Sequence, residues 1–223
     1  MALNFPLYVF DAYGTLFDVH SAVARHRAAV GPQADRLTEL WRMKQLEYTW
    51  VRSLMGAYQD FRGLTADALD HAAARCGGIS PQTRAALLDA YERLDAYPDV
   101  LPALQALKAG GCAVAILSNG TPAMLAAAVQ SAGLAPCIDA ILSVDSLRVF
   151  KTAPQVYALV EARFGLAPAQ VSFQSSNRWD VAGAVNYGFR AVWINRTGQP
   201  DEYADLPPTR ILSGLATLTG ENT

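Results

Sequence analysis

The sequence predicts an α/β fold built on a doubly wound, mainly parallel sheet, with a helical cap inserted after the first strand. Short apolar runs alternate with helix-like segments over most of the chain, which is the pattern of such a sheet. A stretch from residue 17 to about residue 95 breaks this alternation, because it contains no convincing strand. The 223 residues, 52% of them hydrophobic, are enough to bury one sizeable core beside a small inserted subdomain.

The strands are predicted from short apolar runs. These runs lie at residues 7–10, 113–117, 139–142, 171–173 and 191–194. Apolar side chains that point to both faces suit a parallel sheet with helices on either side. Several of the runs end in polar residues, which are Asp11, Ser118 with Asn119, Ser143 and Ser175.

The helices that flank this sheet are predicted from the residues at their ends. A capping residue or a proline at the start and a glycine just past the end are the expected markers. Asp99 is predicted to cap a helix that carries Pro102 in its first turn and ends at Gly110. Further helices are predicted from Thr121 and Pro122 to Gly133, from about Ala153 to Phe164 before Gly165, and from near Trp179 to Asn186 before Gly188.

The inserted segment is predicted to form about four helices in a cap subdomain of residues 17–96, beside a core domain of residues 1–16 and 97–223. Its longest helix, from about Leu37 to Leu54, has apolar side chains on two sides. One side carries Leu37, Leu40, Trp41, Tyr48 and Val51, and the other carries Met43, Leu46, Trp50 and Leu54. A helix that is apolar on two sides packs in two directions, so we expect it to face the cap and either a lid surface or the second subunit of a homodimer.

Composition and charge exclude several classes of partner. A net charge of −2 and a pI near 5.9 leave no basic excess for binding nucleic acid. The N-terminal residues lack the basic start of a signal peptide and the long apolar run of a membrane span. Cys76, Cys112 and Cys137 show no CxxC spacing, which favours free thiols in a reducing cytoplasm. The scattered histidines form no metal-ligand pattern.

Residues that can carry chemistry follow several of the predicted strands. Ligands of open parallel sheets bind outside the carboxyl ends of the strands, so these positions are the first candidates for a site. They offer a carboxylate at Asp11, a hydroxyl at Ser118, an ammonium at Lys151 and a second carboxylate at Asp180. Taken alone, Asp11 fits a turn or cap aspartate equally well, but the four groups together form a catalytic set.

Five runs of residues resemble the L-2-haloacid dehalogenases of the haloacid dehalogenase superfamily. They are FDAYGTLFDVHSAV, LWRMKQLEYTW, DAYPDV, ILSNG and SSNRWD, and they follow the order and spacing of that family over nearly the whole chain. The resemblance implies a Rossmann-like haloacid dehalogenase core with an inserted helical cap. It also implies a cofactor-free enzyme that takes a small 2-haloalkanoate as substrate and releases halide.

The reaction that the resemblance implies has two steps. Asp11 attacks C2 of an (S)-2-haloacid, the halide leaves with inversion at that carbon, and an aspartyl ester forms. Water then attacks the carboxyl carbon of Asp11 and releases an (R)-2-hydroxy acid. Nucleophile and substrate carboxylate are both anions, and at about 4 Å they repel each other by roughly 4 kcal/mol at an effective dielectric near 20, so positive groups must lie close by.

The resemblance also assigns the groups that stabilise these charges. Lys151 is the expected partner of Asp11, and Thr15 is expected to hold the Asp11 carboxylate in place. Arg42, on the long cap helix, is expected to receive the halide together with Asn119. Hydrogen bonds to charged groups contribute about 1.5–3 kcal/mol each, which is enough in sum to offset the repulsion.

Other residues are expected to bind the rest of the substrate. Ser118 and the backbone N–H groups near Ala12 and Tyr13 are expected to hold the substrate carboxylate. An apolar wall around the alkyl group is implied at Leu46, Phe61 and Trp179. Side chains of this kind also serve as plain core, so these three fit both interpretations.

The second step needs a group that orients or activates water. Ser175, Asn177 and Asp180 are the candidates, and Asp180 equally fits a role as the anchor of Lys151. Tyr157 resembles a tyrosine of the family's active site, although it also fits a core aromatic with its hydroxyl at the edge.

Two rival functions remain for this fold, a phosphatase and a non-catalytic binder of an anion or a partner protein. The phosphatases of the superfamily carry a second aspartate two residues after the nucleophile, where this chain has Tyr13, and an acidic pair that holds Mg²⁺. Asp11 and Asp180 alone are a poor cage for a hard cation, so we predict no metal requirement. A binder has no need of a nucleophile at a strand end.

The chain departs from the family pattern in a few places. These departures are Met43, Thr152, Gln174 and Arg178. Arg178 is a large cation close to Asp180 in sequence and is expected to compete for its charge. The sequence leaves open the preferred chain length, the preferred halide, and strict selection of the L over the D enantiomer.

Overall fold

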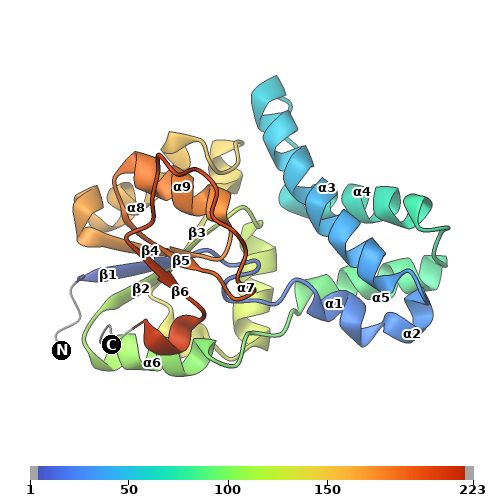
Figure 1. The fold of residues 1–223 in the computed structure, drawn as a ribbon, viewed down its shortest axis with the longest axis horizontal. Helices are drawn as coiled ribbons and strands as arrows, with labels where there is room; N and C mark the ends of the chain where they lie inside the picture. Colours follow the sequence, from blue (N-terminus) through green and yellow to red (C-terminus); the bar gives the residue numbers. More distant parts are fainter. Residues whose placement is uncertain (1–4, 219–223) are drawn as a thin grey trace.

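The sheet of the protein has six parallel strands, as the computed structural model of residues 5–218 shows (Figure 1). The predicted core domain also includes residues 1–4 and 219–223, which lie outside the described residues. Across the sheet the order is β3-β2-β1-β4-β5-β6. The strands are β1 (Leu7–Phe10), β2 (Ala113–Ser118), β3 (Ala140–Ser143), β4 (Val171–Ser175), β5 (Arg190–Ile194) and β6 (Arg210–Leu212).

Strand β1 lies in the middle of the sheet, between β2 and β4. Phe10 pairs with Ile116 on one side and with Gln174 on the other, so the ends of the three strands lie side by side. The strand order reverses beside β1, and ligands of doubly wound sheets bind at such a point. Asp11 follows β1 at this place.

Helices cover both faces of the sheet, which confirms the doubly wound fold (Figure 1). Helices α6 (Val100–Ala109) and α7 (Pro122–Ser131) cover one face, and α8 (Pro154–Phe164) and α9 (Arg178–Tyr187) cover the other. Short 3₁₀ helices connect the elements at η1 (Ala135–Cys137), η2 (Val144–Leu147), η3 (Pro168–Gln170) and η4 (Leu215–Thr217). Among the described residues, no helix is both long and apolar enough to cross a membrane.

Two expectations about this region need correction. Asp99 occupies the N-cap position of α6, but its side chain accepts no capping hydrogen bond. Instead it accepts hydrogen bonds from Arg196 and from the backbone N–H of Leu215. Strand β6 was not predicted, because its three residues follow a proline-rich stretch and Ile211 in its middle is 54% exposed, which leaves no apolar run to detect.

The inserted segment forms a separate group of helices beside the sheet (Figure 1). They are α1 (Ser21–Arg25), α2 (Arg27–Val30), α3 (Ala34–Met55), α4 (Phe61–Arg75) and α5 (Pro81–Glu92). The two chain links to the core run side by side, because Asp18 N–H donates to the Asp95 carbonyl at 2.8 Å and Tyr97 N–H donates to Leu16 at 3.0 Å. The boundaries of cap and core at residues 16 and 97 stay a prediction.

Helix α3 has one packed side and one exposed side. Leu37 and Trp41 are buried, and the Trp41 indole N–H donates to the carbonyl of Thr65 on α4 at 2.8 Å. On the other side, Leu54 is 89% exposed. Val51 was expected on the packed side but is 45% exposed, because the end of α3 projects beyond its neighbours (Figure 1).

Candidate active site

Asp11 is a buried carboxylate whose two oxygens have different surroundings. Because β1 pairs with β4, the Asp11 carboxylate at the end of β1 lies next to the residues at the end of β4. Its Oδ2 accepts hydrogen bonds from Asn177 Nδ2 at 2.7 Å, Thr15 Oγ1 at 3.2 Å and Ser175 Oγ at 3.3 Å. Its Oδ1 accepts from Lys151 Nζ at 3.0 Å. Three donors therefore fix Oδ2, and Oδ1 keeps a lone pair for chemistry.

Lys151 lies between two carboxylates and is itself fully buried. Its Nζ donates to Asp11 Oδ1 at 3.0 Å and to Asp180 Oδ2 at 2.7 Å. Burial by itself would lower the pKa of Lys151, but Asp11 and Asp180 outweigh burial and hold that pKa above its usual value. The ammonium therefore stays charged and reduces the repulsion between the two carboxylates.

Asp180 is the second carboxylate of the site. Its burial outweighs the attraction of Lys151 and raises the pKa of Asp180 to about 6. Tyr157 donates its hydroxyl to Asp180 Oδ1 at 2.8 Å, and burial raises the pKa of Tyr157 well above its usual value, so it remains a donor. A Cβ at Gly183 would lie 2.4 Å from the Tyr157 hydroxyl, so this contact requires glycine there. Tyr157 thus contacts Asp180 and not Asp11.

Arg42 reaches from cap helix α3 to the end of the sheet. Its Nη2 donates to the carbonyl of Tyr13 and to Asn177 Oδ1, both at 3.2 Å. The site therefore contains two carboxylates, Asp11 and Asp180, and two cations. Its formal charge is zero when all four groups are ionised, so an anionic substrate meets no net negative charge.

Several donors next to these groups have no acceptor within residues 5–218. They are the hydroxyl hydrogen of Ser118 and the backbone N–H groups of Ala12 and Tyr13. Ser118 Oγ only accepts, from Gly120 N–H at 3.2 Å. Asn119 Oδ1 accepts from the backbone N–H of Lys151 at 3.0 Å, which leaves its amide hydrogens unused among the described residues. Donors that are free in this way suit an anionic ligand.

The predicted apolar wall is divided between two places. Phe61 is buried and its ring lies 5.4 Å from that of Tyr13, next to Asp11. Trp179 contacts Trp50 of α3, with ring centres 5.5 Å apart, at a different place. Leu46 lies half-buried on α3, one turn after Arg42. Of the two aromatic residues, Phe61 therefore packs against the loop that carries Asp11, and Trp179 packs against the cap helix.

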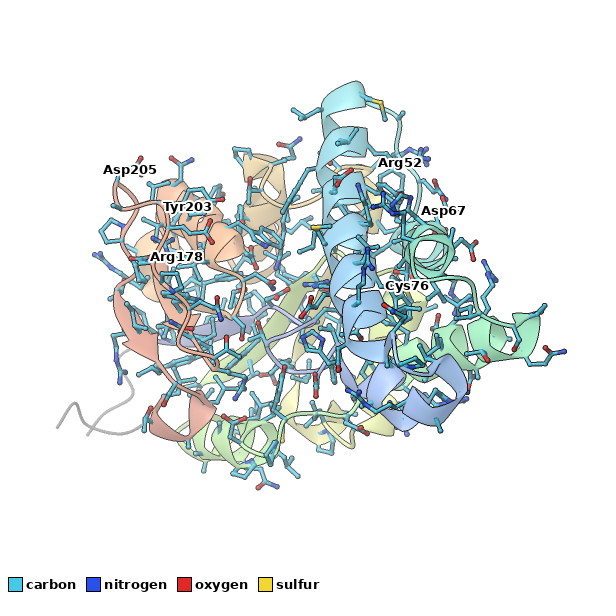
Figure 2. The ribbon with its side chains drawn as sticks, turned by 45° about the vertical axis from the view of Figure 1, so that its right-hand side comes forward. Arg52, Asp67, Cys76, Arg178, Tyr203 and Asp205 are labelled. Atoms are coloured by element: carbon cyan, nitrogen blue, oxygen red, sulfur yellow. The ribbon has the colours of Figure 1, made fainter. Side chains whose placement is uncertain are left out.

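Arg178, one of the departures from the family pattern, points away from the carboxylates. Buried Arg178 donates to Asp201 at 2.5 Å and to the carbonyls of Tyr203 and Leu206, both at 3.0 Å, so the expected competition for Asp180 was wrong. Figure 2 shows Arg178 close to Tyr203. The guanidinium also lies over the ring of Tyr203 at 5.6 Å. Arg178 instead holds the segment between β5 and β6 against the start of α9.

The other departures have equally local surroundings. The side-chain amide of Gln174 donates to Ser172 on the same strand, while the backbone carbonyl of Gln174 accepts the N–H of Asp11 at 2.9 Å. Met43 is 54% exposed on α3, away from Arg42. Thr152 lies against Gly183, the glycine beside Tyr157.

Sequence reasoning missed Gln45 and Tyr91, which connect to Arg42. Gln45 Oε1 accepts from Arg42 Nη1 at 2.8 Å and from the Tyr91 hydroxyl at 3.1 Å. The signal for Gln45 was its position three residues after Arg42, on the same face of a helix. Tyr91 comes from the far end of the inserted segment, and the sequence carries no signal for that contact.

The sequence predicts no metal requirement, and the described residues can be searched for groups of metal-binding side chains. Within residues 5–218, no group of three or more His, Cys, Asp and Glu side chains could hold a metal ion. The space between Asp11 and Asp180 is filled by the Lys151 ammonium. The charges of Asp11 and Asp180 are therefore balanced in part by a cation of the protein itself.

Comparison with known proteins adds independent information. A model of the haloacid dehalogenase-like hydrolases matches residues 5–188. (S)-2-haloacid dehalogenase 1 from Pseudomonas sp. (strain CBS-3) is 46% identical over 211 residues, which are 94% of this chain and 93% of that protein. A solved dehalogenase structure has a TM-score of 0.95 at 43% identity and covers 98% of this chain and 97% of its own. The structure of L-2-haloacid dehalogenase from Xanthobacter autotrophicus with chloropropionic acid covalently bound has a TM-score of 0.89 at 39% identity and covers 96% of each chain.

Proposed function

Because the chain belongs to the haloacid dehalogenase-like hydrolases, we propose that it is an (S)-2-haloacid dehalogenase. It hydrolyses small (S)-2-haloacids to (R)-2-hydroxy acids and halide through an ester on Asp11. The observation that carries this proposal is the asymmetry of the Asp11 carboxylate, with Oδ2 fixed by three donors and Oδ1 paired with Lys151 alone. The covalently bound chloropropionic acid in the related Xanthobacter structure supports the ester.

In the first step Asp11 Oδ1 supplies the electron pair that forms the bond to C2 of the substrate. The carbon–halogen bond breaks on the opposite side, and its electron pair leaves with the halide. Arg42 and the free amide hydrogens of Asn119 receive the halide, and Phe61 contributes an apolar surface. The free donors of Ser118 and of the neighbouring backbone hold the substrate carboxylate.

In the second step water attacks the carboxyl carbon of the Asp11 ester. The bond between that carbon and the ester oxygen breaks, so the product keeps the former Oδ1 and the water oxygen becomes part of Asp11. Asp180 takes a proton from the water and returns it to the departing ester oxygen, which becomes the hydroxyl group of the product. Lys151 and Asn177 stabilise the negative charge that develops on the carboxyl oxygens. Tyr157 and Ser175 position Asp180 and Asp11, respectively.

The two rival functions are less well supported. A phosphatase of this fold needs a carboxylate where Tyr13 stands and an acidic pair that holds Mg²⁺, where this chain has Ser175, Ser176 and Asn177 before Asp180. A protein that only binds an anion or a partner would not need a carboxylate like that of Asp11, in which three donors fix Oδ2 and Oδ1 keeps a free lone pair. The chemistry of the site therefore favours dehalogenation.

Separate incubation with L- and D-2-chloropropionate in the presence of a chelator tests the function directly. We expect chloride release from the L enantiomer alone, at a rate that added Mg²⁺ does not change. Ion chromatography measures the chloride, and chiral chromatography identifies the D-lactate product. Activity that disappears in the chelator and returns with Mg²⁺ would contradict the metal-independent mechanism, and phosphate release from phosphate esters without chloride release would favour the phosphatase.

The hydrolysis of the ester is expected to speed up as pH rises and Asp180 ionises, because only the ionised carboxylate accepts a proton from water. In the free enzyme, burial together with the charge of Asp11 raises the pKa of Asp180 to about 6, so in the ester, where Asp11 is uncharged, the rate is expected to rise below pH 6. Rapid-quench measurement of 2-hydroxy acid release between about pH 5 and pH 8 records this change.

The variant Asp180→Asn separates the two roles of Asp180. As general base, its loss slows the second step by about 10²- to 10⁴-fold, and one equivalent of halide appears before turnover stops. As an anchor of Lys151 alone, its loss slows the first step as well, and no such burst appears. A wild-type hydrolysis rate that does not vary over this pH range would argue against the general-base role.

The exposed side of α3 is proposed as the contact surface of a homodimer. Its apolar residues are Met43, Trp50, Val51, Leu54 and Met55. Light scattering is expected to give twice the 24.0 kDa of one chain. Leu54→Glu is expected to yield monomers, because it places a charge in that surface, while Ile211→Glu on the exposed edge strand β6 leaves the mass unchanged. A monomeric wild type would contradict this assignment.

The proposal also places the enzyme in the cytoplasm, with the 2-haloalkanoate and the halide as its ligands and with neither nucleic acid nor membrane as a partner. The free thiols of Cys76, Cys112 and Cys137 are consistent with a reducing compartment.

A further inference from the structure

Gln45 is a buried amide in the middle of helix α3, next to a residue of the site. It follows Arg42 by three residues, so both side chains leave the same face of the helix. The reaction described above gives it no part. A buried amide nevertheless needs hydrogen-bond partners, and the partners of Gln45 connect it through Arg42 and Asn177 to the nucleophile Asp11.

Two neighbours fix which way the Gln45 amide points. Nε2 donates to Thr65 Oγ1 at 2.7 Å, and the Thr65 hydroxyl in turn donates to the Phe61 carbonyl at 2.7 Å, so Thr65 can only accept from Gln45. The Tyr91 hydroxyl donates to Oε1 at 3.1 Å. Burial raises the pKa of Tyr91, which keeps this proton in place. The carbonyl oxygen Oε1 is therefore the atom that faces Arg42.

Arg42 transmits this orientation to Asp11. Its Nη1 donates to Gln45 Oε1 at 2.8 Å and its Nη2 donates to Asn177 Oδ1 at 3.2 Å. Since Oδ1 of Asn177 accepts from Arg42, its Nδ2 is the atom that faces Asp11, and it donates to Oδ2 at 2.7 Å. A continuous series of hydrogen bonds thus joins a cap amide to the nucleophile.

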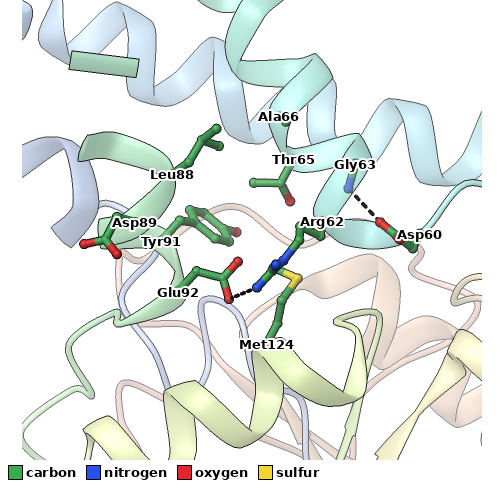
Figure 3. Close-up of a pocket in the computed structure, with 10 residues that line it drawn as sticks. All are labelled: Asp60, Arg62, Gly63, Thr65, Ala66, Leu88, Asp89, Tyr91, Glu92 and Met124. Atoms are coloured by element: carbon green, nitrogen blue, oxygen red, sulfur yellow. Dashed lines mark hydrogen bonds and ion pairs between the residues drawn. The ribbon is translucent and has the colours of Figure 1, made fainter. Parts of the chain in front are cut away.

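The neighbours of Gln45 also border a cavity between the cap and the core. Thr65 and Tyr91 line this cavity of about 520 Å³, and Met124 of α7 closes it from the core side (Figure 3). The two residues that orient the Gln45 amide therefore lie between Gln45 and this cavity. Without it, the Arg42 guanidinium would lose its fixed partner on the cap and could turn about its contacts with the core.

We propose that Gln45 is a positioning residue for dehalogenation, which holds the Arg42 guanidinium where the halide leaves. This role rests on the proposed function, because it is in that reaction that Arg42 receives the halide. Gln45 acts on the first step through Arg42, and it touches neither the substrate nor the reacting atoms.

The variant Gln45→Met keeps the size of the side chain and removes the acceptor. Pre-steady-state halide release with L-2-chloropropionate is expected to fall about 10- to 100-fold, which corresponds to the loss of one hydrogen bond to a charged group. The fall is expected to be smaller with L-2-bromopropionate, because bromide needs less stabilisation as it leaves. A general loss of structure would lower both rates by the same factor.

A second measurement asks whether Gln45 acts through Arg42. In an Arg42→Lys background the ammonium cannot bridge Gln45 and Asn177, so Gln45→Met is expected to have little further effect. Tyr91→Phe removes only the hydroxyl that orients Gln45 and is expected to show a weaker form of the same change in leaving-group preference. It provides a test even where Gln45→Met does not fold.

Thr49→Val serves as the matched control. Thr49 is buried one turn further along α3, and its hydroxyl donates to the Leu46 carbonyl of the same helix. We expect it to leave the ratio of the chloride and bromide rates unchanged. Equal losses for both halides in Gln45→Met, or a full loss in the Arg42→Lys background, would overturn the positioning role. A wild type that releases no halide would refute the proposed function instead.

Discussion

Replacing Asp11 with alanine is expected to lower halide release by a factor on the order of 10⁵ to 10⁶, the loss seen when a nucleophile is removed. The variant keeps the buried ion pair of Lys151 with Asp180, so its fold is expected to survive. Buried Thr15 and Ser175 lose an acceptor but keep the hydrogen bonds that they accept from the backbone N–H groups of Ser176 and Asn177. The effect is therefore catalytic rather than structural.

Two measurements distinguish the loss of a nucleophile from a general effect of removing a carboxylate. Mass spectrometry of the wild type after a single turnover in ¹⁸O-labelled water is expected to find the label in the peptide that contains Asp11, because water attacks its carboxyl carbon. Asp18→Ala is the matched control, since Asp18 is a half-buried carboxylate of the same loop that accepts a backbone N–H from His20. It is expected to change the rate by no more than about twofold. Label that appears in the product and not in the protein would rule out the ester.

Replacing Lys151 with methionine is expected to have the second largest effect, because it alters both stability and rate. The variant leaves Asp11 and Asp180 buried without the cation between them. Breaking a buried ion pair from one side costs about 3–5 kcal/mol, and removing a preorganised charge from the site lowers the rate by about 10²- to 10³-fold or more. Urea unfolding and halide release measure the two effects.

The pH dependence of this loss follows from the protonation of Asp180. Its pKa is already raised to about 6, and the removal of Lys151 raises it further. The folded variant then binds a proton more tightly than the unfolded chain, so its stability improves as pH falls and worsens as pH rises through the folded pKa. Lys108→Met is the control, because Lys108 pairs with Asp139 at 2.6 Å on the surface, where such pairs contribute about 0–1 kcal/mol. An equal loss of stability in both variants would contradict the argument.

The sequence was sufficient to predict the parts of the site that come from strand ends. Asp11, Ser118 and Ser175 each follow an apolar run, and parallel strands bring such positions to one edge of the sheet. Helix ends were equally clear where the capping residue bonds to its own helix. Thr121 is an example, because its hydroxyl accepts the Met124 N–H at 3.3 Å. The helical insertion was visible because no strand interrupts it.

What the sequence could not supply were contacts between distant segments. Asp99 carries the sequence marker of a helix cap, but Arg196, far along the chain, competes successfully for its carboxylate. Arg178 is adjacent to the site in sequence and yet pairs with Asp201, because its side chain leaves α9 in another direction. Local patterns determine where helices begin, whereas long-range charge pairs are decided by the packing of whole elements.

The central place of β1 has a consequence for the synthesis of the protein. The first strand to leave the ribosome finds its neighbours only when Ala113 and Val171 have been added. At typical rates of translation, the residues between Leu7 and Ala113 take roughly 5–20 s to make. During that time the segment of β1 lacks both of its pairing partners, and unpaired strand edges are prone to aggregation. Asp11 gains its last hydrogen-bond donor when Asn177 emerges, so a chain that stops before that residue has an Asp11 carboxylate that is only partly held in place.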